Sequence, residues 1–343
     1  MTEFVRADES TPRSAEQADS KTISSRPSSR RKPINRSQQS LRRPSRETYS
    51  TRTVEFESGE ETCVGTLYLP DRPETPPVVV MAPGVGLWRT FGLPAVAERF
   101  AEAGYAAFVF DFRHLGDSTG EPRGLVSPSK QIADYEAAID AMGATEDVDS
   151  NRLVLWGHSL SGGHVLSVAA ENFRVAGVIA TCPFADGRSQ TLGMIRQPKQ
   201  LLKSLATGLR DALGHRIGFG SDVSIVDDED GFGVITAPGA KRELFDLVDR
   251  HADWQNRVPG RIFLSLPRYR PLTEVDEIRC PALVIGGRDD RIVPGEGAAD
   301  AAAGIADATY LELPVDHFSV FGDDFETVVG HQLTFLRTVV GHR

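Results

Sequence analysis

Residues 152–163 of the chain read RLVLWGHSLSGG, and this stretch decides the fold and indicates the chemistry. Its first part, Arg152–Trp156, is a short apolar run of the kind that forms a strand buried on both faces of a parallel sheet. Ser159 follows between two small residues, Gly157 and Ser161, and a helical pattern begins directly afterwards. A sharp turn between a strand and a helix exposes a serine hydroxyl above the sheet and tolerates only small residues two positions on either side. We therefore predict that Ser159 is a nucleophile.

A serine nucleophile needs a histidine base, and the base needs an acid that orients it. On this kind of turn the three residues follow one another in the order serine, acid, histidine. The loops after two later apolar runs supply both partners, GRDDRIVP from position 287 and PVDHF from position 314. We predict His317 as the base and Asp290 as the acid. Asp289 is the alternative acid, and Asp186 is a more distant one.

The reaction also needs backbone N–H groups that hold a developing oxyanion. The first predicted donor is Leu160, whose N–H lies at the positive end of the helix after the serine. The second comes from the loop after an earlier strand, MAPGVG at positions 81–86. Gly84 lets the backbone approach a substrate closely, so the next N–H, that of Val85, is predicted to point into the site.

Short apolar runs alternate with helical patterns through most of the chain. Residues 51–57 and 62–69 alternate apolar and polar side chains and predict an antiparallel hairpin. The other predicted strands are Pro77–Ala82, Ala106–Asp111, Arg152–Gly157, Ala176–Cys182, Ala282–Gly286 and Ala308–Leu313. The predicted helices are Phe91–Ala103, Ser127–Met142, Leu160–Ala170 and Asp324–Val340. Such alternation predicts an α/β fold, a parallel sheet with helices on both faces.

One segment of roughly 85 residues interrupts this alternation and is too long for a connecting loop. It holds an amphipathic stretch (Met194–Leu213), a Gly/Asp-rich loop (Gly218–Gly233) and a further helical stretch (Lys241–Asp253). We predict an inserted cap at 186–272, which divides a core into residues 51–185 and 273–343. The cap residues expected to roof an apolar acyl pocket are Met194, Ile195, Leu201, Leu202 and Leu205.

The first 50 residues have a different composition from the remainder. They hold eleven serines, four prolines and only scattered large apolar residues, which cannot offset the entropy of ordering, so we predict a disordered basic tail at 1–50. No apolar segment follows its arginines, so we expect no export signal. Residues 55–343 carry 26 Lys and Arg against 42 Asp and Glu, and this excess of negative charge predicts no nucleic-acid partner.

Composition excludes further classes of protein. No run approaches the roughly 18 consecutive apolar residues of a membrane span. The three cysteines, Cys63, Cys182 and Cys280, are odd in number and far apart, which favours reduced thiols and a cytoplasmic location over a disulfide framework. No cluster has metal-ligand spacing and no phosphate-binding glycine motif is present, so we expect neither a metal nor a cofactor.

Four motifs in this order give the chain a resemblance to the α/β-hydrolase superfamily from about residue 51 to the end, outside the cap. They are the Pro83–Gly86 loop, the run DFRHLGDS at 111–118, the Ser159 turn, and the two loops that hold Asp290 and His317. The chain departs from the common pattern at Pro83, where many members have histidine, and at His114 and Ser161, where glycine is usual. The resemblance implies a serine hydrolase on an eight-stranded, mostly parallel sheet, similar to esterases and acyl-peptidase-like hydrolases.

From these residues we expect hydrolysis of a small-molecule carboxylic ester through an acyl-enzyme. A peptidase or amidase has the same three residues but needs an anchor for a peptide terminus, and none is evident. A thioesterase or acyltransferase is also open, although the acidic body offers no basic patch for an acidic carrier. A non-catalytic binding protein on the same fold is the remaining alternative.

Overall fold

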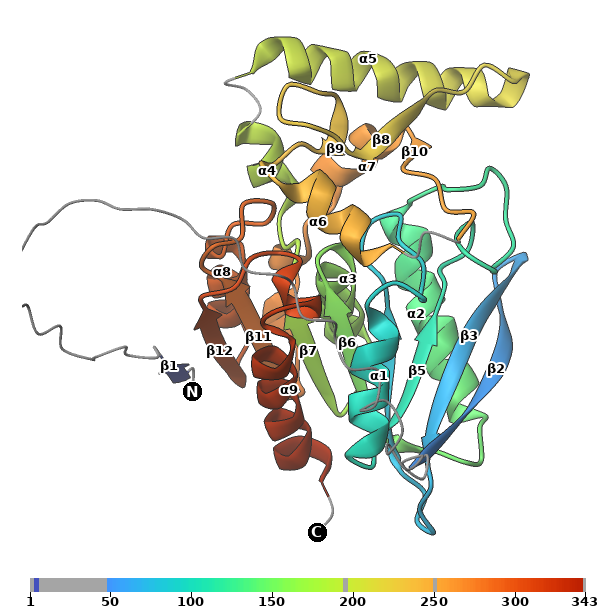
Figure 1. Cartoon of the computed structure of the whole chain (residues 1–343), viewed down its shortest axis with the longest axis vertical. Coiled ribbons are helices and arrows are strands. Elements are labelled where there is room, and N and C mark those ends of the chain that lie inside the picture. The colour runs from blue at the N-terminus through green and yellow to red at the C-terminus, as the bar shows by residue number, and fades with distance from the viewer. Residues whose placement is uncertain (1–2, 6–47, 194–196, 249–251, 342–343) are drawn as a thin grey trace, which may run out of the picture. The chain divides into compact units, whose positions relative to one another are not determined.

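The computed structural model describes residues 3–5, 48–193, 197–248 and 252–341. A large sheet with helices on both faces carries a cap above the carboxyl ends of its central strands (Figure 1). In the described residues the sheet has nine strands, in the order β1-β12-β11-β7-β6-β4-β5-β3-β2. Their bounds are β1 Glu3–Val5, β2 Tyr49–Ser58, β3 Glu61–Pro70, β4 Pro77–Ala82, β5 Ala106–Phe110, β6 Asp149–His158, β7 Gly177–Thr181, β11 Ala282–Gly287 and β12 Ala308–Leu313.

The sheet confirms the predicted α/β-hydrolase architecture. The hairpin of β2 and β3 pairs antiparallel, β3 pairs antiparallel with β5, and the strands from β5 to β12 pair parallel. Beside the eight predicted strands, β1 lies parallel to the outer side of β12. It falls within the segment predicted to be disordered; positions 6–47 of that segment lie outside the described residues.

Helices cover the two faces of the sheet and define two apolar cores. The helices are α1 Leu93–Glu102 and α9 Phe325–Val340 on one face, and α2 Pro128–Gly143, α3 Leu160–Glu171 and α8 Glu296–Gly304 on the other. Strand β4 contributes Val78 and Val80 to one core and Val79 and Met81 to the other, all four fully buried. Because both faces of such a strand are covered, the strand reads in the sequence as a continuous apolar run.

Between β7 and β11 the chain forms the cap. Its elements are α4 Gly187–Gly193, α5 Pro198–Gly214, β8 Asp222–Val226, β9 Gly233–Ile235, α6 Ala240–Leu247, β10 Val258–Pro259 and α7 Ile262–Ser265. The three strands form a small sheet in the order β10-β8-β9. Short 3₁₀ turns occupy His215–Ile217, Leu266–Arg268, Pro271–Thr273, Val275–Glu277 and, beyond the cap, Ser319–Phe321.

The structure of the cap differs from the prediction in two details. The stretch predicted as a Gly/Asp-rich loop, 218–233, contains strand β8, which pairs with β10 and β9 and buries Val223 and Ile225. The helix predicted from Lys241 to Asp253 is shorter, since α6 ends at Leu247. The limits 186 and 272 of the inserted segment stay a prediction. In the part of the chain that is described, no helix has the length and apolar character needed to cross a membrane.

Candidate active site

Ser159 lies at the strained turn that the sequence predicts. It joins β6 to α3 with φ 61° and ψ −123°, a left-handed conformation that non-glycine residues rarely adopt. The chain is tightly folded here, because a Cβ added at Gly157 would lie 2.2 Å from the carbonyl oxygen of Ser161. Glycine is therefore required two residues before the serine.

Ser161, which stands where glycine is usual, braces this turn. Its Oγ accepts a hydrogen bond from the N–H of His158 at 3.0 Å. The same oxygen lies 2.9 Å from two acceptors, the carbonyl oxygens of His158 and of Ala82 at the end of β4. The hydroxyl thus ties the serine turn to the neighbouring strand, which a glycine does not do.

The structure brings together the three residues predicted as nucleophile, base and acid. The Nε2 of His317 lies 2.9 Å from the Oγ of Ser159, and its Nδ1 lies 2.7 Å from the Oδ2 of Asp290. All three side chains are buried. The loops that carry them follow β6, β11 and β12, whose carboxyl ends meet at one edge of the sheet.

The Asp290 carboxylate is held on both of its oxygens. Its Oδ1 accepts hydrogen bonds from the N–H groups of Ile292 and Val293, each at 2.8 Å, which leaves Oδ2 directed at His317. Burial by itself raises the pKa of Asp290. The hydrogen bond and charge interaction with His317, together with the two N–H groups, outweigh burial and place the pKa below its ordinary value. Asp290 is therefore an anion at neutral pH, as an orienting acid must be.

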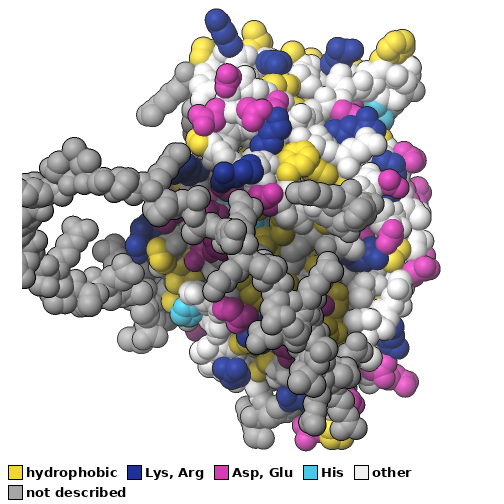
Figure 2. All heavy atoms as spheres, viewed as in Figure 1, with side chains coloured by type: hydrophobic (Ala, Val, Ile, Leu, Met, Phe, Trp, Pro, Cys, Tyr) yellow, Lys and Arg dark blue, Asp and Glu magenta, His cyan; other side chains and the backbone are white. Residues whose placement is uncertain are grey.

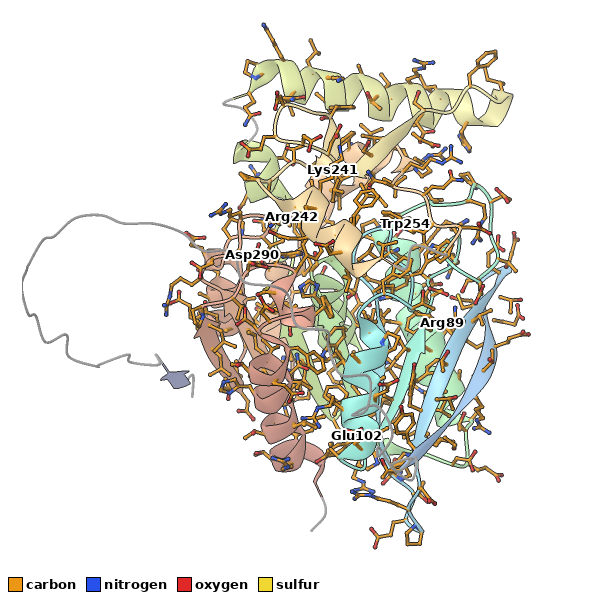
Figure 3. The ribbon with its side chains drawn as sticks, viewed as in Figure 1. Arg89, Glu102, Lys241, Arg242, Trp254 and Asp290 are labelled. Atoms are coloured by element: carbon orange, nitrogen blue, oxygen red, sulfur yellow. The ribbon has the colours of Figure 1, made fainter. Side chains whose placement is uncertain are left out.

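The two alternative acids lie elsewhere. Asp289 has an exposed side chain, although it is the direct neighbour of Asp290. Asp186 forms an ion pair with Arg270, with Oδ1 3.0 Å from the guanidinium Nε, and caps the start of α4. Figure 3 shows Asp290 below the cap helix α6, which carries Lys241 and Arg242. These contacts favour Asp290 among the three aspartates.

The two predicted oxyanion donors flank Ser159. Leu160 opens α3, and the first N–H groups of a helix have no partner within it. Gly84 passes so close to the serine that a Cβ placed on it would lie 3.9 Å from the Oγ of Ser159. Val85 follows Gly84 and lines the same cavity as Ser159 and Leu160.

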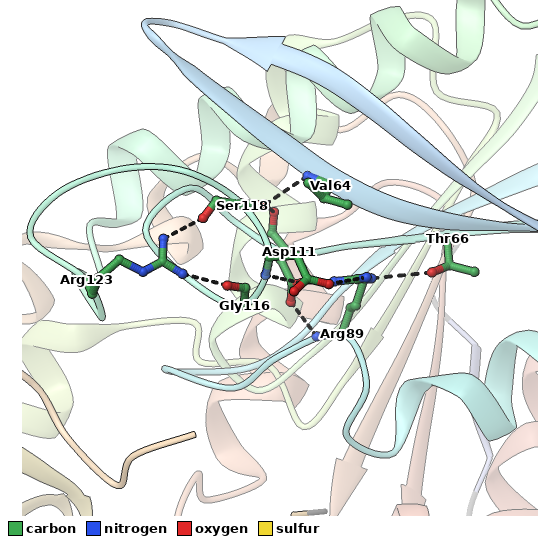
Figure 4. A network of polar contacts seen from close by, with 8 residues as sticks. Val64, Thr66, Arg89, Asp111, Gly116, Ser118 and Arg123 are labelled. Carbon is green, nitrogen blue, oxygen red and sulfur yellow. Dashed lines mark hydrogen bonds and ion pairs between the residues drawn. The ribbon is translucent and has the colours of Figure 1, made fainter. Parts of the chain in front are cut away.

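A network of polar contacts holds the loop that carries Val85 (Figure 4). The buried carboxylate of Asp111 accepts the N–H of Arg89 at 2.6 Å and forms an ion pair with the guanidinium of the same arginine. Ser118 donates to the carbonyl of Asp111 at 2.7 Å and accepts the N–H of Val64 in β3 at 2.9 Å. The run 111–118 thus anchors the loop that carries Val85 to the sheet.

His114 within that run has φ 71°. The position therefore takes the left-handed conformation in which glycine has no steric penalty, and this accounts for the usual glycine there.

A cavity of about 270 Å³ opens over Ser159, between the sheet and the cap. Apolar side chains from both layers line most of it, among them Leu160, Phe184, Leu201, Leu205 and Phe232. Leu201 and Leu205 thus have the position expected from the sequence. Leu202 does not, because its side chain turns outward and is 69% exposed. Met194 and Ile195 lie outside the described residues.

Two buried side chains lie behind the triad and are not among the predicted catalytic residues. The ring centroids of His158 and His317 are 4.6 Å apart, and burial together with this neighbour lowers the pKa of His158 well below its usual value. The thiol of Cys182 contacts Asp290. Burial is the main cause that raises the pKa of this thiol, and the negative charge of Asp290 raises it further. The sequence signal for both is position: each ends or follows a central strand at the edge where Ser159 lies.

In the described part of the chain, His158, Cys182 and His317 are the residues whose ligand atoms lie close enough together to hold a metal ion. One ligand atom from each of His158, Cys182 and His317 lies within 4.8 Å of the others. Both ring nitrogens of His317 already bond to Asp290 and Ser159, so a metal ion here would have to displace those contacts. The arrangement fits proton transfer between serine and histidine better than metal binding.

Comparisons with known proteins agree with this architecture. Residues 79–330 match the model of the Alpha/beta hydrolase family. The quorum-quenching protein AidA of Acinetobacter baumannii is 35% identical over 289 residues, which cover 84% of this chain and 94% of that protein. The thiohydrolase aneE of Aspergillus aculeatus is 26% identical over 291 residues, covering 80% and 89% of the two chains.

A solved structure has the same fold. The α/β hydrolase GrgF from a Penicillium species superposes with a TM-score of 0.73 at 23% identity, over 85% of this chain and all of that one.

Proposed function

Because this chain belongs to the α/β hydrolase family, we propose that it hydrolyses a carboxylic ester through an acyl-enzyme formed on Ser159. The observation that carries this proposal is the position of His317, with one ring nitrogen on Ser159 and the other on Asp290, below a mainly apolar cavity. Acyl transfer needs a nucleophile, a base and an orienting acid in this relation.

In the first step His317 removes the proton of Ser159 as the serine oxygen attacks the acyl carbonyl. The distance of 2.9 Å between Nε2 and Oγ is that of a hydrogen bond along which the proton moves. Asp290, 2.7 Å from Nδ1, keeps the ring in the tautomer whose Nε2 has a free lone pair and stabilises the positive charge that develops on it.

The negative charge that develops on the carbonyl oxygen would be held by the N–H groups of Leu160 and Val85. Each such donor contributes about 3–4 kcal/mol to the transition state in enzymes where one has been removed. His317 then protonates the leaving alcohol, and a water molecule activated by the same ring releases the acid from Ser159.

The cavity sets the size of the acyl group. At about 270 Å³ the cavity lies at the small end of the range of small-molecule pockets, which is about 300–1,000 Å³. Its largely apolar wall favours an apolar acyl group, and its small volume favours one shorter than a long fatty acid. We therefore expect the best substrates to have short or medium acyl chains.

The test is hydrolysis of p-nitrophenyl esters from acetate to palmitate by the wild type and by S159A. The proposal expects a maximum of kcat/KM at short or medium chains, and background rates in S159A with an unchanged melting temperature. Turnover by S159A near the wild-type rate would contradict it. Bacterial quorum signals that carry an acyl carbonyl belong in the panel, because the relative from Acinetobacter baumannii is named for quorum quenching.

A thioester is the second candidate substrate, since two relatives covering most of this chain are named thiohydrolases. The same three residues attack a thioester, so the comparison must hold the acyl group constant. Rates on a butyryl ester, a butyryl thioester and a butyryl amide separate the two candidates and the amidase alternative. The second candidate is favoured if the ratio of kcat/KM for the thioester to kcat/KM for the ester exceeds the ratio of their uncatalysed hydrolysis rates.

A further inference from the structure

Exposed apolar side chains gather on one element of the cap. Among the described residues eight large hydrophobic side chains are exposed, and six of them belong to α5 and the turn that follows it. These six are between 46% and 72% exposed: Leu202, Leu205, Leu209, Leu213, Ile217 and Phe219. Scattered single residues of this kind are normal on a protein surface, whereas a contiguous group marks a site of interaction.

The four leucines form a stripe along the helix. They are spaced by three, four and four residues, which places them on one side of α5 over about three turns. The opposite side faces the cap, where Gly208 and Asp211 are buried and Asp211 pairs with Arg261 at 2.6 Å. The outer face of α5, as we call the stripe Leu202, Leu205, Leu209 and Leu213, is therefore fixed outward by packing on its other side.

Basic side chains accompany this face. Lys199, Lys203 and Arg210 are exposed and follow one flank of the stripe, as expected from their helical positions. Asp211 is the single acidic residue of α5, and it points inward. Residues 55–343 hold four lysines against 42 acidic residues, yet two of those lysines lie on this helix. Figure 2 shows hydrophobic and basic side chains side by side along the end of the cap where α5 runs.

We propose that the outer face of α5 binds an anionic lipid surface, with the helix lying flat in the interface. An amphipathic helix with an apolar stripe and lysines beside it buries its apolar face among the acyl chains and places its cations among the headgroups. Figure 1 shows α5 lying across the end of the cap that faces away from the sheet, so its whole length is available to a flat surface.

A second copy of the chain fits this face less well. Two such helices packed together would bring two rows of Lys199, Lys203 and Arg210 to one interface. Helix α5 itself offers no exposed carboxylate to pair with them, because its one acidic residue, Asp211, is buried against Arg261. An anionic lipid surface can bury the apolar stripe and also pair with the basic side chains beside it.

Binding there would also bring the lipid close to the cavity. Leu201 and Ser204, on the inner side of α5, line the cavity over Ser159, and Leu205 belongs both to this lining and to the stripe. A substrate with an apolar acyl group concentrates in a lipid phase. A protein held by α5 would therefore meet such a substrate beside the cap.

The experiment is cosedimentation of the full chain with phosphatidylcholine vesicles, with and without phosphatidylglycerol. The basic residues before position 55 can attract anionic lipid by themselves, so matched variants decide the outcome. The double variant L202E/L209E removes half of the stripe without touching the cavity, and F173E makes the same change at an exposed phenylalanine outside α5. K199E has a matched control in K130E on α2.

The proposal expects binding that requires phosphatidylglycerol, falls about tenfold or more in L202E/L209E, weakens in K199E and is unchanged in both controls. Hydrolysis of a soluble short ester at the wild-type rate would show that L202E/L209E is folded. If the wild type cleaves no ester, an unchanged melting curve of L202E/L209E shows the same. Binding that L202E/L209E retains would overturn the proposal. The proposal would also be overturned if the wild type does not bind vesicles but forms a dimer in analytical ultracentrifugation, and L202E/L209E abolishes that dimer.

Discussion

Replacing Asp290 by asparagine tests the proposed roles of the triad one atom at a time. The amide side chain introduced in D290N has the same shape as the carboxylate, so its carbonyl oxygen still accepts the N–H groups of Ile292 and Val293. Its NH₂ group then faces the Nδ1 of His317, where the wild type has a carboxylate oxygen at 2.7 Å. Two N–H donors cannot face each other, so the ring must carry its proton on Nε2 instead.

That tautomer places an N–H 2.9 Å from the Oγ of Ser159, and a protonated nitrogen cannot accept the serine proton. In serine proteases with the same three residues this replacement lowers kcat about 10⁴-fold, or about 5 kcal/mol of transition-state stabilisation. We expect a loss of the same order here.

The assay is kcat on a p-nitrophenyl ester, with D289N as the matched control. Asp289 is the adjacent residue and carries the same charge, but its side chain is exposed, so we expect D289N to retain kcat within about twofold. Melting curves of both variants check that the fold is intact. If D290N keeps more than a tenth of the wild-type kcat, or if D289N loses more activity than D290N, the reasoning is wrong.

Three further predictions concern the site and its supports. Gly84→Ala is expected to leave the melting temperature unchanged, because its Cβ makes only ordinary contacts, and to lower kcat/KM about 10²-fold, because that Cβ lies 3.9 Å from the Oγ of Ser159. Unchanged kinetics would refute this. Asp111→Asn removes the buried partner of Arg89 and is expected to lower the free energy of unfolding in urea by about 3 kcal/mol or more, with a loss of activity; full stability would contradict it. His164 has a pKa lowered by burial to about 3, so the unfolded chain binds its proton first and stability falls with pH below about 6.5. Between pH 7.5 and 5, His164→Gln should lose about 2 kcal/mol less than the wild type in urea titrations, and equal losses would exclude this origin.

The central strands were predictable because a parallel sheet covered on both faces needs continuous apolar runs. The predicted Pro77–Ala82 and Ala308–Leu313 coincide with β4 and β12, and Ala282–Gly286 differs from β11 by one residue. The position of the loops after these strands was predictable as well, since the carboxyl ends of parallel strands meet at one edge of the sheet. The sequence therefore predicts that Ser159, Asp290 and His317 lie together, and in the structure their side chains are within hydrogen-bond distance.

The cap was less predictable because its elements depend on contacts between distant segments. Strand β8 lies between glycines and aspartates and is held by pairing with β9 and β10. Leu202 has the same apolar character as Leu201, and only packing of α5 on the cap decides that one faces solvent and the other the cavity. Helix α8, rich in alanine and glycine, carries too weak a pattern to be predicted.

The site also contains residues whose roles depend on the fold alone. His158 and Cys182 are apart in the chain, yet both lie behind the triad because β6 and β7 are neighbours in the sheet. The hydroxyl of Ser161 replaces the usual glycine without opening the turn, because it finds acceptors on His158 and Ala82. No spacing rule reports such contacts, which arise from strand adjacency.

The measurement that tests the central claim most directly is covalent labelling by a fluorophosphonate probe, followed by intact mass and peptide mapping. The account predicts one adduct per chain, located on Ser159, and none in S159A. It also predicts much slower labelling of D290N than of D289N, because the reaction needs the serine proton to pass to His317. An adduct on another residue, or no adduct on a folded chain, would contradict the claim that Ser159 is an activated nucleophile.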